Sequence, residues 1–175
     1  MKKSTFLFIV VLFVSFVACK DAKREREQML QNIKNTEKEI LADSLDFLSF
    51  KNAGKVIALY DEFAEKYPED TLTPMFLFRK GEITMNTNQH DLSLKTFDLV
   101  IEKYPNFYEL DRVYFMRAFL LENYINDIEK AKEAYNTFMQ KFPDNELFED
   151  AKISLENIGK TPEELIMEFE SKHKD

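Results

Sequence analysis

The sequence predicts an all-α protein, and three observations lead to that prediction. Only three glycines and five prolines occur among 175 residues, under half of average usage, and β-rich folds need more turn residues than this. Apolar residues recur at the three-four spacing of one helix face, as at Val56, Leu59, Tyr60 and Phe63. A Lys-aromatic-Pro phrase also occurs three times, with its prolines 37 and then 38 residues apart. A hydrophobic content of 45% excludes wholesale disorder.

The first residues have the pattern of a secretory signal peptide. Lys2 and Lys3 precede an apolar run that begins at Phe6, and small and apolar residues lead to Cys19. The alternative is a transmembrane anchor, but the apolar stretch 6–19 is shorter than the ~20 residues that span a bilayer. We therefore assign residues 1–18 to a signal peptide.

Cys19 is the only cysteine, so it cannot form a disulfide within the chain. The segment 16–19, Phe-Val-Ala-Cys, resembles the bacterial lipobox, and this resemblance implies cleavage before Cys19 and lipidation of its thiol. The alternative is a cysteine that remains in a cleaved tail. Lipidation predicts a bacterial envelope protein, anchored to the outer membrane and facing the periplasm, with residues 19–35 as a charged tether. The sequence does not distinguish periplasmic from surface exposure.

Apolar periodicity and end signals predict eight helices after the tether. The Lys-aromatic-Pro phrases end helices because the residue before proline avoids the α region. Three candidate capping boxes mark starts, namely Thr36 with Glu39, Asn126 with Glu129, and Thr161 with Glu164. Residues 20–35 are open to two interpretations, a spacer or a leading helix. The predicted helices are 37–50, 54–67, 74–86, 89–103, 108–124, 127–141, 146–158 and 162–172.

The spacing of the repeated residues resembles the tetratricopeptide repeat (TPR). In that pattern a small residue precedes an aromatic by 16 positions and a proline by 24. The offsets are met by Gly81, Phe97 and Pro105, by Ser44, Tyr60 and Pro68, and, with one extra residue expected in the Tyr124–Asp127 turn, by Ala118, Tyr135 and Pro143. The resemblance implies a TPR-like α-solenoid over residues 36–175, with three helix-pair units of period 37–38 and a C-terminal capping helix pair.

Two kinds of bacterial TPR protein have a similar pattern of residues along the repeat. One is the TPR domain of the Tol-Pal-associated cell-division coordinator. The other is the TPR lipoprotein of the outer-membrane β-barrel assembly machinery, which shares the predicted lipid anchor. By its apolar residues Leu165, Ile166 and Phe169, we expect the last helix to cap the solenoid's apolar end.

Signals of chemistry are sparse. The two histidines, His90 and His173, are predicted to be exposed surface residues, and no spacing typical of a metal site or phosphate-binding loop occurs. A net charge of −8 argues against nucleic-acid binding. We therefore predict no enzyme, no cofactor, no metal and no small-molecule substrate.

The function is expected to depend on surface shape, because the first helix of each TPR pair lines a concave groove. The resemblance implies that Leu41, Leu45 and Leu48 face inward in the first unit. In the other two units the candidate groove residues are Met75, Phe78, Glu82, Met85, Arg112, Phe115, Phe119 and Glu122. The alternative is that most of the apolar ones belong to the core.

These features favour a lipid-anchored scaffold that binds a peptide or helix of another envelope protein. Two alternatives remain open. One is a subunit of the outer-membrane protein assembly machinery, and the other is a lipoprotein that binds a glycan or nutrient.

Overall fold

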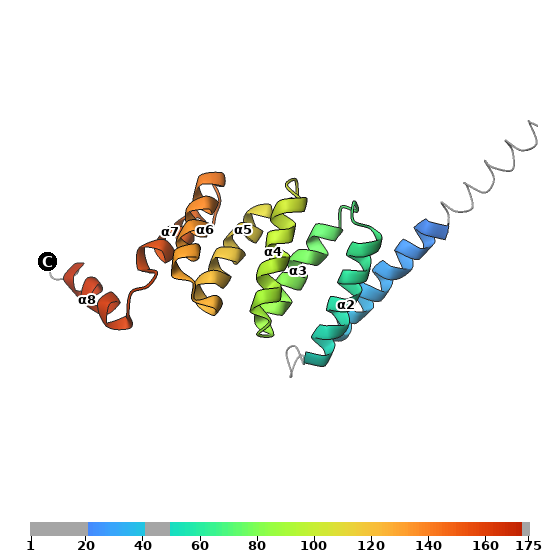
Figure 1. Ribbon diagram of the computed structural model, residues 1–175, viewed down its shortest axis with the longest axis horizontal. Helices are drawn as coiled ribbons and strands as arrows, with labels where there is room; N and C mark the ends of the chain where they lie inside the picture. The colour runs from blue at the N-terminus through green and yellow to red at the C-terminus, as the bar shows by residue number, and fades with distance from the viewer. Residues whose placement is uncertain (1–20, 41–49, 173–175) are drawn as a thin grey trace, which may run out of the picture. The chain divides into compact units, whose positions relative to one another are not determined.

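The computed structural model describes residues 21–40 and 50–172, and the side chains of residues 50–52 and 172 lie outside the description. All regular secondary structure in these ranges is helical, as predicted. The chain divides into two compact units, Met1–Lys66 and Tyr67–Asp175, and Figure 1 colours them from blue to teal and from green to red. The predicted signal peptide, Cys19 and His173 lie outside the described residues.

The N-terminal unit contains a helix at residues 21–40 and α2 (Phe50–Lys66), which pack as a pair. The hydroxyl of Tyr60 donates a hydrogen bond of 2.6 Å to the Glu37 carboxylate. The guanidinium carbon of Arg26 lies 6.0 Å from the ring centroid of Phe63, and Lys66 forms an ion pair with Glu25. These three contacts tie one helix to the other along much of their length.

The leading segment therefore differs from a simple tether. Residues 21–35 are helical, and Met29 and Ile33, which lie one turn apart, are buried. The interpretation as a leading helix is the one that the structure supports. Thr36 lies within this helix rather than at its start, so the predicted capping box there is wrong. The predicted small residue and groove residues of this unit lie outside the described residues, namely Leu41, Ser44, Leu45 and Leu48.

The C-terminal unit is a linear array of helices that follow one another in chain order (Figure 1). Each helix from α3 to α7 packs against the next. The bounds are α3 Thr73–Asn86, α4 His90–Lys103, α5 Leu110–Leu120, the π-helical turn η1 Leu121–Ile125, α6 Ile128–Lys141, α7 Phe148–Asn157 and α8 Pro162–Lys172. None of the described helices is both long enough and apolar enough to span a bilayer.

The loops after the three Lys-aromatic-Pro phrases share one backbone pattern. Two successive turns follow each phrase, because the aromatic carbonyl accepts from the amide three residues later and that residue's carbonyl accepts from the amide three residues beyond. The chains of hydrogen bonds run through Tyr67, Asp70 and Thr73, through Tyr104, Phe107 and Leu110, and through Phe142, Asn145 and Phe148. These double turns end where the next helix begins.

The small residue of the central pair lies at a close approach between α3 and α4. A Cβ atom on Gly81 would lie 2.3 Å from Cε1 of Phe97, whose ring is fully buried. The hydroxyl of Ser93 donates a hydrogen bond of 2.8 Å to the Gly81 carbonyl. In the next pair, Ala118 and Tyr135 are also fully buried.

The extra residue of the third unit lies in the π-helical turn. Asn88 and Asn126 both have positive φ, 59° and 60°, and occupy equivalent places after the first helix of their pairs. Gly81 precedes Asn88 by seven residues, whereas Ala118 precedes Asn126 by eight. A π-helical turn absorbs one additional residue without ending the helix. The predicted location, the Tyr124–Asp127 turn, overlaps this π-helical turn only at Tyr124 and Ile125.

The same turn changes how α6 begins. Asn126 takes the left-handed conformation, and the amide of Asp127 donates a 2.9 Å hydrogen bond to the Leu121 carbonyl. Asp127 is therefore the capping residue, and its carboxylate accepts from the Lys130 amide at 3.2 Å. The predicted box of Asn126 with Glu129 is wrong, because Asn126 is the left-handed residue that ends η1, and the side chain that caps α6 is that of Asp127.

The last helix does not bury its apolar side chains. Its capping box is confirmed, since the Thr161 amide donates to Glu164 at 2.7 Å and the Glu164 amide donates to Thr161 at 3.2 Å. The prediction that this helix caps the array through its apolar face is wrong, because exposures run from 37% at Leu165 to 64% at Phe169. Gly159, at φ 82°, turns the chain away from α7 before α8 starts.

Candidate functional site

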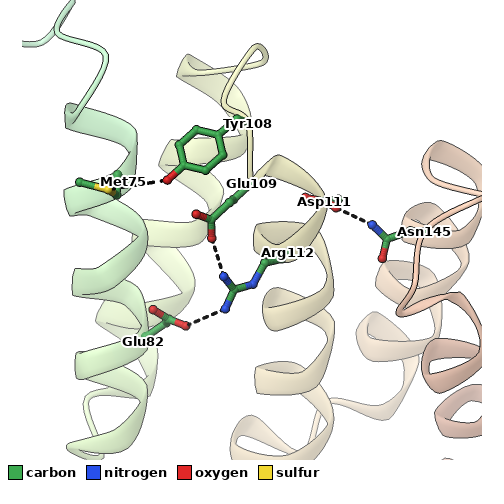
Figure 2. Close-up of polar contacts among 7 residues, drawn as sticks. All are labelled: Met75, Glu82, Tyr108, Glu109, Asp111, Arg112 and Asn145. Atoms are coloured by element: carbon green, nitrogen blue, oxygen red, sulfur yellow. Dashed lines mark hydrogen bonds and ion pairs between the residues drawn. The ribbon is translucent and has the colours of Figure 1, made fainter.

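One cluster of polar and aromatic side chains lies on the surface that α3 and α5 share. Met75 and Glu82 project from α3, and Tyr108, Glu109 and Arg112 project from the start of α5 and the loop before it (Figure 2). We call these five residues the α3/α5 face. They come from the first helices of consecutive pairs and from the loop before the second of these helices, and the sequence predicts a groove along these first helices.

Arg112 is the central residue of this face and is held from three directions. Its Nη1 donates to the Glu109 carboxylate at 2.5 Å, and its Nη2 lies 3.9 Å from Oε1 of Glu82 (Figure 2). Its guanidinium carbon lies 5.4 Å from the ring centroid of Phe78, a cation–π distance. About half of the Arg112 side chain remains exposed (51%). The guanidinium is therefore oriented by the protein before any partner binds.

Glu82 is the electrostatically strained member of the face. Burial raises the pKa of Glu82 above its ordinary value, and the negative charge of Glu109 raises it further. The positive charges of Arg112 and Arg79 act in the opposite direction but do not offset these effects. The ionised carboxylate is thus less stable here than in water.

Tyr108 is the most exposed aromatic residue that the structure describes, at 72%. Its ring packs edge-on against Phe107, with centroids 5.0 Å apart, and Phe107 in turn contacts Phe78 at 6.3 Å. The Tyr108 hydroxyl lies 3.8 Å from the sulfur of Met75 (Figure 2). An exposed tyrosine beside an oriented arginine is a composition typical of protein-binding hot spots.

The loop that carries Tyr108 differs from its two counterparts. At the equivalent positions, Asp70 and Asn145 accept hydrogen bonds from the amides of Leu72 and Leu147, which closes an Asx turn. The central unit has Phe107 there and keeps the same backbone turns without that side-chain bond. An aromatic pair therefore replaces a polar turn in this unit alone.

The predicted groove residues divide between surface and core. Arg112 is exposed, and Met75, Glu82 and Glu122 are partly exposed. Phe78 and Met85 are buried core residues, at 2% and 4%, so the alternative of a core role applies to them. Phe115 and Phe119 are partly buried: Phe115 packs edge-on against Tyr135 and Phe138, and Phe119 packs edge-on against Tyr124.

Glu122 is occupied within its own unit. Its carboxylate accepts a 2.7 Å hydrogen bond from the hydroxyl of Tyr135. Burial and this hydrogen bond raise the pKa of Tyr135. The Glu122 carboxylate therefore links η1 to α6 through a hydrogen bond within the protein.

Sequence reasoning missed Tyr108 and Glu109. Both follow the repeated Pro by a fixed offset, and the other units have Thr71 and Glu146 where Tyr108 stands. An aromatic that breaks the repeat pattern in a loop was the signal available.

The prediction that His90 is an exposed surface residue is wrong. His90 starts α4 and is half-buried, with its ring centroid 5.0 Å from that of Tyr124. Its Nε2 atom is buried and has no hydrogen-bond partner. Among the described residues, no three or more His, Cys, Asp and Glu side chains gather in a way that could hold a metal ion.

Comparison with known proteins gives one family match. Residues 112–145 match the tetratricopeptide repeat family, a stretch that runs from Arg112 through η1 and α6 to the Asx turn at Asn145. A search of curated protein sequences found no match. The repeat match and the helix-pair array together support a TPR-like helical solenoid, and a TPR repeat suggests a protein–protein interaction scaffold.

Proposed function

We propose that this chain is a lipid-anchored protein of the bacterial envelope that holds a peptide or helix of another envelope protein on its α3/α5 face. The observation that carries the proposal is the exposed Tyr108 beside an Arg112 that is already oriented by Glu109 and Phe78. Ordering before binding reduces the entropy lost when a partner docks.

The envelope location rests on the sequence of the first nineteen residues. A basic start, an apolar run and Cys19 directly after it favour export and lipidation. Two or three acyl chains give stable anchoring where one gives only marginal binding. Outer-membrane anchoring with the repeats facing the periplasm is the arrangement we propose.

Site-specific photo-crosslinking tests the binding face. A photoreactive phenylalanine analogue at position 75 or 108 is expected to capture a discrete partner band in living cells. The control position is 129 on α6, where the Glu129 side chain is 84% exposed. Equal crosslinking from all three positions, or none from 75 and 108, would count against the α3/α5 face.

A second experiment tests the anchor separately. Replacement Cys19→Ala is expected to move the protein from the membrane fraction to the soluble fraction and to remove the mass of the acyl chains from the mature N-terminus. Lipidation would be refuted if the Cys19→Ala variant stayed in the membrane fraction and the wild-type protein had an unmodified N-terminus. That result would not affect the proposal for the binding face.

A further inference from the structure

We propose that the α3/α5 face recognises a basic side chain, arginine or lysine, of its partner, with the Glu82 carboxylate as counter-ion and the Tyr108 ring in contact with a neighbouring part of the same partner. This inference rests on the proposed function and names the partner chemistry that this same face would take. Four features of the described residues lead to it.

The first feature is that the Arg112 guanidinium lies much closer to the Glu109 carboxylate than to the Glu82 carboxylate. Its Nη1 is 2.5 Å from Glu109, whereas its Nη2 is 3.9 Å from Glu82. The guanidinium also makes a cation–π contact with Phe78. A move of the guanidinium toward Glu82 would therefore weaken its contacts with Glu109 and Phe78 in order to shorten the one with Glu82. The Glu82 carboxylate therefore remains incompletely neutralised in the free protein.

The second feature is the environment of Glu82. Burial and the nearby charge of Glu109 outweigh the effects of Arg112 and Arg79, so the pKa of Glu82 is raised. A cation brought by a partner would stabilise the ionised carboxylate, because an opposite charge at short range in a partly desolvated place interacts more strongly than in water.

The third feature is the exposed ring of Tyr108. Aromatic faces attract guanidinium and ammonium groups, and the aliphatic stem of either side chain packs on apolar surface. Met75 lies next to the Tyr108 hydroxyl and extends this surface with an adaptable thioether. A partner thus finds apolar surface at the end of the face formed by Tyr108 and Met75 and a carboxylate at the Glu82 end (Figure 2).

The fourth feature is net charge. Residues 67–175 contain 22 acidic and 13 basic residues, a net charge of −9. Such a surface steers basic partners toward it and disfavours acidic ones. An acidic peptide on Arg112 is the opposite possibility, but the guanidinium already binds Glu109, and Glu82 would repel an incoming carboxylate.

A displayed library of random twelve-residue peptides, selected on the immobilised full chain, tests this inference. Enriched peptides are expected to contain lysine or arginine, and to lose binding to the Tyr108→Ala variant. The best peptide is then synthesised with its basic residue and with glutamine in that place. At physiological ionic strength the glutamine peptide is expected to bind about tenfold more weakly, the range of a close charge pair.

A mutant cycle assigns that loss to Glu82. On Glu82→Gln, the same peptide substitution is expected to change Kd by less than about threefold, while on the control Glu129→Gln it keeps its full effect. Far-UV circular dichroism verifies that each variant is folded. An equal loss on wild type and Glu82→Gln would overturn the inference.

Two other outcomes separate this inference from the proposed function. Enrichment of acidic peptides whose binding depends on Arg112 would overturn the basic-residue inference and leave the binding face intact. Enrichment of no peptide, or only of peptides indifferent to Tyr108→Ala, would overturn both.

Discussion

Replacing Gly81 by alanine tests the packing of the central helix pair. The added Cβ would lie 2.3, 2.7 and 2.9 Å from three ring atoms of Phe97, whereas ordinary contacts begin near 3.4 Å, so α3 and the ring must separate by about 1 Å. Overpacking of this kind costs about 1–3 kcal/mol, and the better helix propensity of alanine returns about 1 kcal/mol. We therefore expect a net loss of up to about 2 kcal/mol in the free energy of unfolding, or a fall in Tm of up to about 8 °C.

The matched control is Gly54→Ala in α2. A Cβ there has no atom within 4 Å, so only the propensity gain operates and stability is expected to rise by about 0.5–1 kcal/mol. Urea denaturation followed by circular dichroism measures both variants. The reasoning is refuted if Gly81→Ala is as stable as Gly54→Ala. In a Gly81→Ala background, Phe97→Leu is expected to be less harmful than in wild type, because the smaller side chain relieves the overlap.

Three further predictions concern the surface of the array and its helix ends. Glu82→Gln is expected to stabilise the protein at pH 7. Burial raises the pKa of this carboxyl, so the ionised form destabilises the folded protein. This destabilisation is absent below the ordinary carboxyl range and grows as pH rises through the raised pKa. The difference in denaturation midpoint between wild type and Glu82→Gln should therefore vanish near pH 3.5, somewhat below the ordinary glutamate pKa of about 4.3. Deletion of residues 162–175 is expected to change Tm by less than about 2 °C, because the apolar side chains of α8 are exposed. The comparison variant is Phe138→Ala, which removes a fully buried ring and should cost about 3–5 kcal/mol. A comparable loss of stability from the deletion would show that α8 is packed. Asp127→Ala is expected to cost about 1 kcal/mol as the loss of a cap, whereas Glu129→Gln should be nearly neutral in the same thermal melts, and the reverse order would restore the capping box expected from sequence.

The repeat was readable from sequence because its determinants are local and recur. A proline after an aromatic ends a helix wherever it occurs, and the 16-residue offset from Gly81 to Phe97 is a direct consequence of two helices packed at close range. The helix bounds from α3 to α6 follow for the same reason. The extra residue in the third unit was also visible, as a change in one offset.

What the sequence did not provide depends on contacts between distant residues. The helix at 21–40 has only a weak apolar period, and its packing becomes clear only when Tyr60 and Phe63 of α2 are seen beside Glu37 and Arg26. The apolar residues of α8 have the spacing of a buried face, yet nothing in that spacing states whether the chain turns back toward α7. In the structure these side chains are exposed, and Gly159 takes a left-handed φ of 82° between α7 and α8.

The π-helical turn has a consequence for how such a chain can vary in length. Its extra residue lies upstream of Asn126, and the distance from that asparagine to the following proline is 17 residues in both units. The insertion is thus confined to one helix end, where Tyr124 meets His90, and the second helix and its loop keep their registration. Insertions or deletions of single codons would be tolerated in the η1 turn. The same changes between Asn126 and Pro143 would rotate α6 and misplace Tyr135 and Phe138.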